Sequence, residues 1–266
     1  MQRKKIIGIS IEKDRVTFCQ RTRTAISKKH NISSHLYNKN ADLIQIIKDY
    51  RRTMDHIKAH IAIGIDHTFY RQTTLTLPNQ LKQKEIDRYL DHSLSQHIPQ
   101  ADQHRFTYTY YNFNKKCHIT LYYCPNLVIE QIHSMVHQHH WKAISLTPAP
   151  ARLHTLSQPS THKPLCIILN QNKTETFYFF YRRHLVASDT ISSTRTNIPH
   201  PIAIFFSEQP TGSQLQIISQ NKTNTLKTHL DNKIKIKFSL LKEKHIECNH
   251  NELIALSLIR RARHVR

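Results

Sequence analysis

The stretch KIIGISIEKDRVTFCQ, Lys5 to Gln20, decides the fold. Its isoleucines alternate with Gly8 and Ser10, and a period of two is typical of a strand with one buried face. The charged residues around Asp14 then predict a tight turn, after which the alternation of apolar residues resumes. We therefore expect a β-hairpin near the start of the chain.

A related stretch, LCIILNQNKTETFYF at 165–179, has the same design of strand, polar turn and strand. In the first half the hairpin is followed by a third strand at 31–37, an amphipathic helix at 41–57 and an apolar strand at 60–65. This order, β-β-β-α-β, is the plan of a ribonuclease H-like layer. The second half predicts strands at 165–169, 175–181, 185–192, 215–219 and 234–240, and a closing helix at 252–263. We therefore expect an α/β fold made of two halves with one plan.

The middle of the chain does not fit this repeat and predicts an inserted α+β subdomain. Its expected elements are a strand at 71–77, a helix at 83–97, a hairpin at 105–123 and a helix at 126–140. The proline-flanked stretch at 157–164 is the best linker candidate. We expect three parts: residues 1–66 with 141–157 as the first half, 67–140 as the inserted subdomain, and 163–266 as the second half.

The composition favours anionic partners and a reducing compartment. The 39 lysines and arginines exceed the 18 aspartates and glutamates, so the formal net charge of the 266 residues is 39 − 18 = +21. A surface of this sign suits nucleic acid or an anionic membrane face. The five cysteines are scattered without paired spacing, and no signal peptide or apolar run of membrane-spanning length stands out. We expect a cytoplasmic protein.

The sequence also contains candidate residues for a metal site and for a nucleic-acid-binding surface. His133 and His137 lie one helical turn apart, but no H-E-x-x-H motif and no cysteine pair with zinc spacing accompany them, so we expect no metal site. Aromatic residues on the strand predicted at 105–113 suit base stacking, but no glycine-aromatic ribonucleoprotein motif is present. A basic DNA-binding protein therefore stays an alternative that rests on net charge.

The stretch IAIGIDHTFYRQTTLTLPNQLKQKEIDRYLDHSLSQHIP, Ile61 to Pro99, carries a resemblance to a known family. Its Leu77-Pro78, the segment from Leu81 to Ile86 and the helix ending at Ile98-Pro99 resemble PilM-type actin-like proteins of type IV pilus and competence machines. The likeness is greater to their short relatives of the HofM or competence ComA kind. The resemblance implies an actin-like fold with duplicated ribonuclease H-like halves, an inserted subdomain and, here, a shortened second half.

The resemblance also implies three loops that would hold ATP between the halves. Backbone amides approach phosphate closely where glycine removes the side chain, yet the chain has three glycines in all. The family's acidic and glycine positions are degraded in each loop, and the residues that replace them are Ser10, Glu12, Leu169, Gln171, Gln220 and Asn221. We expect no nucleotide cofactor and no catalytic activity. An actin-like ATP-binding protein with atypical loops stays an alternative.

The remaining role that the resemblance implies is that of a scaffold. Proteins of this family grip the N-terminal cytoplasmic tail of a single-span membrane partner, PilN, at the inner membrane of a pilus, competence (DNA-uptake) or secretion platform. The residues expected to line the groove for that tail, or else to pack the subdomain core, are Leu75, Leu77, Leu81, Ile86, Tyr89 and Leu90. An anionic membrane surface is a further expected partner, and DNA a less favoured one.

Overall fold

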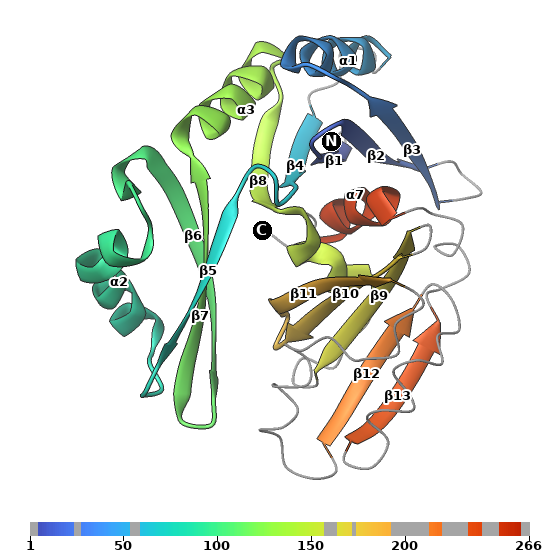
Figure 1. Ribbon diagram of the computed structural model, residues 1–266. Coiled ribbons are helices and arrows are strands. Elements are labelled where there is room, and N and C mark those ends of the chain that lie inside the picture. Colours follow the sequence, from blue (N-terminus) through green and yellow to red (C-terminus); the bar gives the residue numbers. More distant parts are fainter. Residues whose placement is uncertain are drawn as a thin grey trace.

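The computed structural model describes residues 5–23, 28–53, 59–156, 164–171, 174–192, 213–219, 234–240 and 250–261. Two five-stranded sheets and one three-stranded sheet carry the fold (Figure 1). The helices and strands that the sequence predicted at 83–97, 105–113 and 126–140 form at those places, with ends that differ by a few residues. For the second half the sequence also predicts a short helix or strand within 197–209 and a helix at 224–232, and both lie outside the described residues.

The two five-stranded sheets have the same strand order. The first is β3-β2-β1-β4-β8 and the second is β11-β10-β9-β12-β13. Their strands are β1 (Lys5–Ile11), β2 (Arg15–Arg23), β3 (Lys28–Leu36), β4 (Ala59–Ile65) and β8 (Lys142–Pro148), and β9 (Leu165–Gln171), β10 (Thr174–Tyr181), β11 (His184–Ser192), β12 (Ser213–Ser219) and β13 (Ile234–Leu240). In both sheets the first strand pairs antiparallel with the second and parallel with the fourth. The duplicated ribonuclease H-like plan that the sequence predicted is therefore confirmed.

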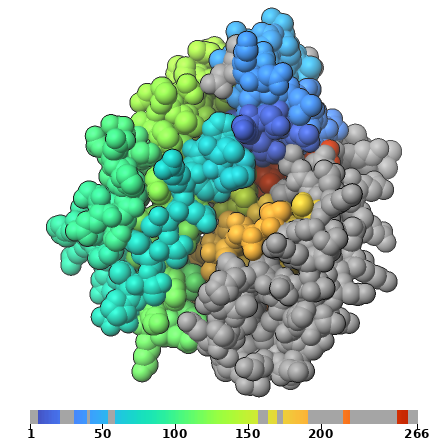
Figure 2. All heavy atoms as spheres, in the orientation of Figure 1, coloured from blue at the N-terminus to red at the C-terminus, as the bar shows by residue number. Residues whose placement is uncertain are grey.

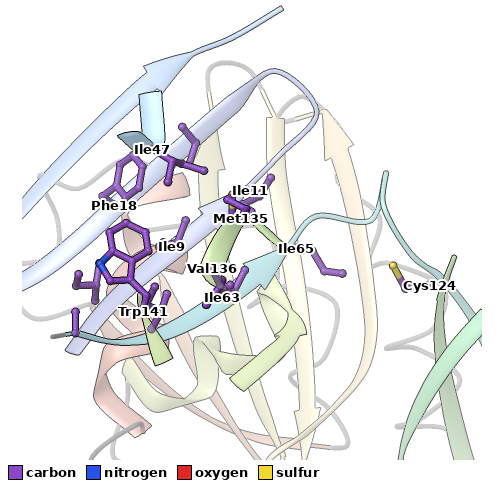
Figure 3. Packing of buried hydrophobic residues seen from close by; sticks show 14 of the residues in the cluster. Ile9, Ile11, Phe18, Ile47, Ile63, Ile65, Cys124, Met135, Val136 and Trp141 are labelled. Atoms are coloured by element: carbon purple, nitrogen blue, oxygen red, sulfur yellow. The ribbon is translucent and has the colours of Figure 1, made fainter. Parts of the chain in front are cut away.

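One face of the first sheet packs against two helices, α1 (Asn40–Arg52) and α3 (Asn126–Gln138). Ile7, Ile9 and Ile11 of β1 point to this face because side chains alternate along a strand. Ile9 and Ile11 pack there with Ile47 of α1 and with Met135 and Val136 of α3 (Figure 3). This cluster is the core of the first half.

The opposite face of the first sheet is covered by α7 (His250–Arg261) and by the 3-10 helix η2 (Ala149–Leu156). On this face β1 and β4 carry Gly8 and Gly64, and α7 packs very close to both glycines. A Cβ atom on Gly8 would lie 2.4 Å from the carbonyl oxygen of Ala255, and one on Gly64 would lie 3.0 Å from Cδ1 of Leu258. Gly8 therefore serves the approach of a helix in this fold.

Helix α7 is buried on all sides, from Leu253 to Ile259. It lies between the first and second sheets (Figure 1), and one hydrophobic cluster joins it to Cys19 of β2 and to Ile167 of β9. A helix that is apolar around its circumference is typical of a fully enclosed position. The two halves thus share a common core.

The third sheet has the order β5-β7-β6 and one helix against it. Its elements are β5 (Arg71–Leu77), α2 (Gln83–His97), η1 (Ala101–Gln103), β6 (His104–Phe113) and β7 (Lys116–Pro125). Asn114 and Lys115 turn the β6–β7 hairpin with φ of 47° and 59°, as a type I′ turn requires. We call this unit the inserted sheet.

The inserted sheet contacts both halves. Tyr122 of β7 donates a hydrogen bond of 3.3 Å to the carbonyl oxygen of Leu185 in β11, and the ring of Tyr111 lies 5.3 Å from that of Tyr181. The range 67–140 predicted for the inserted subdomain includes α3, whose buried side chains belong to the core of the first half. Likewise, the range 163–266 includes α7, which covers the first sheet.

Candidate functional site

The first candidate site is the cleft at the carboxyl ends of the parallel strands β1 and β4, where ligands bind in many open α/β sheets. The chain after β1 turns through Glu12, whose backbone N–H donates to the carbonyl oxygen of Arg15 at 2.8 Å. Asp66 follows β4, and its backbone N–H donates to the carbonyl oxygen of Ile11 at 2.9 Å. Two carboxyl groups therefore lie near one another at this end of the sheet, close enough for the charge of Asp66 to act on Glu12.

Electrostatics in this cleft oppose a bound phosphate. The pKa of Glu12 is raised to about 8, mainly by burial and then by the nearby charge of Asp66, while the charge of Arg15 acts in the opposite direction. One carboxyl oxygen of Glu12, Oε1, is buried without a hydrogen-bond partner among the described residues. The charge of Asp66 repels anions, the neutral Glu12 carboxyl provides no positive charge to offset it, and no glycine exposes backbone amides beside the two.

Tyrosines fill much of the space around the two carboxyl groups. Tyr37 donates from its hydroxyl to the carbonyl oxygen of Glu12. Tyr178, on β10 of the second half, is buried, and burial followed by the charge of Asp66 raises its pKa. Burial likewise raises the pKa of Tyr70 above its ordinary value. Side chains from both halves therefore meet in the cleft.

The residues expected at the positions of the degraded loops lie in different environments. Ser10 is fully buried in β1 with its hydroxyl unpartnered among the described residues, and Leu169 is a core residue of β9. Gln171 ends β9, and Gln220 and Asn221 lie outside the described residues. Asp66 was not predicted as a site residue from the sequence. The available signal was an acidic residue directly after an apolar strand, and this strand pairs parallel with β1.

A pH-dependent stability is expected from Glu12. The unfolded chain releases its proton near pH 4.5 and the folded chain near pH 8, so within this window the folded state binds more protons. Its free energy of unfolding therefore falls as the pH rises through the window. Because glutamine does not ionise, Glu12→Gln should gain about 2 kcal/mol over the parent protein between pH 4.5 and about pH 9, a value reduced for partial exposure.

Urea denaturation of both proteins across this pH range measures the difference. The Asp49→Asn variant, altered at an exposed carboxylate of α1, is the control and should show no comparable trend. A constant difference between Glu12→Gln and the parent protein across the window would contradict the raised pKa.

The six residues predicted for the partner groove lie in the core of the inserted sheet. Ile86 and Leu90 of α2 are 0% and 1% exposed, and they pack against Ile119 and Leu121 of β7. The other four, Leu75, Leu77, Leu81 and Tyr89, are half-buried against the same cluster. The structure thus brings the six together, but as packing between a helix and a sheet.

A groove does exist between the first half and the inserted sheet, at other residues. A cavity of about 210 Å³, called here the inner pocket, is lined by Ile65, Tyr70, Arg105, Phe106, Thr107, Tyr122, Tyr123, Cys124, Ile129, Leu146, Thr147 and Pro148. These residues come from the ends of β4 and β8, from β6 and β7, and from α3, apart from Tyr70, which directly precedes β5. Among the described strands, β6 and β8 are the edges of their sheets, so each has one side without a strand partner there.

The inner pocket is apolar and uncharged away from Arg105. Burial raises the pKa of Cys124 to about 11 and that of Tyr122 to about 12, so both are neutral at pH 7. Phe106 is 40% exposed on the wall, one of the large apolar side chains that the described residues leave open to solvent. Oγ1 of Thr147 is buried with no hydrogen-bond partner among the described residues. A ligand with apolar groups would cover Phe106, and a free backbone group of the same ligand would form a hydrogen bond with Thr147 Oγ1.

A second cavity, of about 450 Å³, adjoins the inner pocket, lies along α3 and is called here the outer groove. Its lining is Arg105, Asn126, Ile129, Glu130, His133, Ser134, His137 and Gln138. The rings of His133 and His137 are 6.3 Å apart on the exposed side of the helix. In the part of the chain that the structure describes, no group of three or more histidine, cysteine, aspartate or glutamate side chains is placed to hold a metal ion.

Figure 2 shows the inserted sheet beside the two halves on one face of the molecule. The pockets were missed by the sequence analysis because their walls come from segments far apart in the chain. Phe106 belongs to the aromatic strand predicted at 105–113. The alternation of residues along that strand does not indicate that the edge of another sheet lies near it.

The chain matches no known protein family by sequence, and no curated protein matches it either. Its fold does match solved structures. A chain of the PilM-PilN type IV pilus biogenesis complex superposes with a TM-score of 0.62 at 8% identity, over 98% of this chain and 99% of the other. The cytoplasmic domain of EpsL, an inner membrane component of the type II secretion system of Vibrio cholerae, has a TM-score of 0.52 at 8% identity, over 96% and 95%.

A third structure, a protein of unknown function with an actin-like ATPase fold from Bacteroides thetaiotaomicron, has a TM-score of 0.48 at 10% identity, over 96% of this chain and 95% of the other. The fold of this chain is actin-like, as its duplicated sheet order and the first two likenesses show. Of the helices that are described, none combines the length and the apolar composition needed to cross a bilayer.

Proposed function

We propose that this protein is a non-catalytic scaffold of a pilus, competence or secretion assembly platform at the cytoplasmic face of an inner membrane. It holds the N-terminal cytoplasmic tail of a PilN-like single-span membrane protein. The observation that carries the proposal is the inner pocket, which opens between two sheet edges of a fold that is similar to a chain of the PilM-PilN complex. The likeness to EpsL supports the same class of assembly.

The inner pocket suits an extended peptide. Edge strands offer unpaired backbone groups, and a peptide that lies along such an edge gains main-chain hydrogen bonds while its alternate side chains enter pockets. Here β6 supplies one edge and β8 the other, with Phe106 and Tyr70 as aromatic walls. A bound tail would also give Thr147 Oγ1 the partner that the described residues do not provide.

The test begins with capture of partners from detergent-solubilised membranes on the immobilised protein. A synthetic peptide of the captured protein's cytoplasmic N-terminus is then titrated by fluorescence anisotropy. We expect saturable binding and a single-span partner. Phe106→Asp should weaken the binding at least tenfold, because the tail would have to bury a carboxylate in the apolar wall, and its desolvation costs about 1.4 kcal/mol or more.

The matched control is Leu36→Asp, which alters an apolar side chain that is 68% exposed on β3, outside the inner pocket. It should bind the peptide as the parent protein does. If the captured protein's tail does not bind, or if both variants weaken it equally, the groove is not its site.

The non-catalytic part of the proposal rests on the cleft at Glu12 and Asp66. Phosphate placed there would meet two carboxyl groups and no glycine-lined cradle. Calorimetric titration with Mg-ATP is therefore expected to show no binding. A micromolar dissociation constant would favour the alternative of an actin-like ATP-binding protein.

A further inference from the structure

The inner pocket and the outer groove adjoin each other, since Arg105 and Ile129 line both. Their chemistry differs. The inner pocket is walled by aromatic and aliphatic side chains, whereas the outer groove is walled by amide, hydroxyl, imidazole and charged groups of α3. A peptide that fills the first pocket and continues outward therefore changes surroundings at Arg105.

Arg105 is an exposed cation on edge strand β6, and no carboxylate of the described residues lies within ion-pair distance of it. Glu130 is the one carboxylate among the residues that line the outer groove, and it does not pair with Arg105. A guanidinium group binds a carboxylate through two parallel hydrogen bonds, which makes it selective as well as attractive. The net charge of +21 adds a long-range attraction for an acidic segment.

A second polar group of the outer groove also lacks a partner. Asn126 donates from Nδ2 to the carbonyl oxygen of Asp102 at 3.0 Å, which fixes the orientation of its amide. Its Oδ1 is buried and accepts no hydrogen bond from the described residues. A carbonyl oxygen held in this way suits a backbone N–H of a peptide that runs along the start of α3.

We propose that the outer groove reads a carboxylate in the bound tail. The tail carries an aspartate or glutamate directly beside its apolar stretch, and this side chain pairs with Arg105 while a neighbouring backbone N–H donates to Asn126 Oδ1. The acidic residue lies at the junction of the two pockets because Arg105 lines both of them. This inference deepens the proposed function and rests on it.

A positional-scanning library of synthetic peptides, selected on the immobilised full chain, tests the inference. The parent protein should select apolar residues at successive alternate positions and an acidic residue at one adjoining position. Arg105→Glu should reverse that one preference to lysine or arginine, with the acidic peptide weakened at least tenfold and the apolar preferences kept.

Arg88→Glu, at an exposed arginine of α2 that lines neither pocket, is the control and should select the same peptides as the parent protein. Denaturation curves confirm that both variants are folded. Selection of apolar residues without an acidic preference, or an acidic preference that Arg105→Glu leaves unchanged, would overturn this inference and leave the proposed function standing. Selection of no peptide at all would overturn both.

Discussion

Replacing Gly8 with alanine is expected to destabilise the fold by about 3 kcal/mol, at the upper end of the costs of overpacking a core. The new Cβ atom would lie 2.4 Å from the carbonyl oxygen of Ala255 and 2.9 Å from Cγ2 of Ile259. The first of these is backbone, in a helix enclosed between two sheets, so the clash is relieved only by moving α7. Chemical denaturation of the purified variant measures the loss.

Ser10→Ala is the control for Gly8→Ala, because Ser10 is two residues along β1 and points to the same face. It removes a buried hydroxyl that has no partner among the described residues, so its effect on stability should be neutral or slightly favourable. If Gly8→Ala were as stable as Ser10→Ala, the close contact between β1 and α7 would be wrong.

Replacing Leu90 with alanine should cost about 2–5 kcal/mol, as expected for a large-to-small change in a closed core. Leu90 is 1% exposed between α2 and the inserted sheet, where Ile86 and Ile119 surround the space that the change would empty. Denaturation measures the loss of stability, and hydrogen exchange should show it first in the strands and helix of the inserted sheet.

Arg88→Ala, at an exposed position of the same helix, should stay within about 0.5 kcal/mol of the parent protein. This pair of variants also decides between two roles for the six residues that the sequence assigned to the groove. If Leu90→Ala leaves the stability unchanged but abolishes binding of the partner tail, the six residues belong to the binding site.

The sequence predicts the fold well because its signals are local. The alternation in β1, the apolar run of β4 and the spacing in α2 each report a buried face within a few residues. The repeat of the same plan after residue 164 then predicts two similar sheets, and the structure confirms the same strand order in both. The likeness to solved structures agrees with this fold.

The candidate site was less predictable because its parts meet only in three dimensions. Periodic apolar residues such as Ile86 and Leu90 report burial, and burial by itself does not distinguish a core from a binding groove. The inner pocket instead uses an exposed Phe106 on one sheet edge and Thr147 on another. No local pattern tells that two edges from separate sheets face the same space.

The closing helix was predicted as a helix, but its environment was not. Its spacing predicts one buried stripe at Leu253, Leu256 and Ile259, whereas α7 is buried on every side from Leu253 to Ile259. Its surroundings are set by η2 and by strands of both sheets, which lie far away in the sequence. For the same reason, no local pattern indicates that Gly8 makes room for a helix and not for a phosphate.

The place of α7 has a consequence for biosynthesis. The helix follows every described strand in chain order, yet it fills the space between the two large sheets. A nascent polypeptide therefore leaves both apolar surfaces open until α7 has emerged from the ribosome, and such surfaces are recognised by chaperones or aggregate. Products of premature termination before residue 250 should be degraded before they can compete with intact copies for a membrane partner.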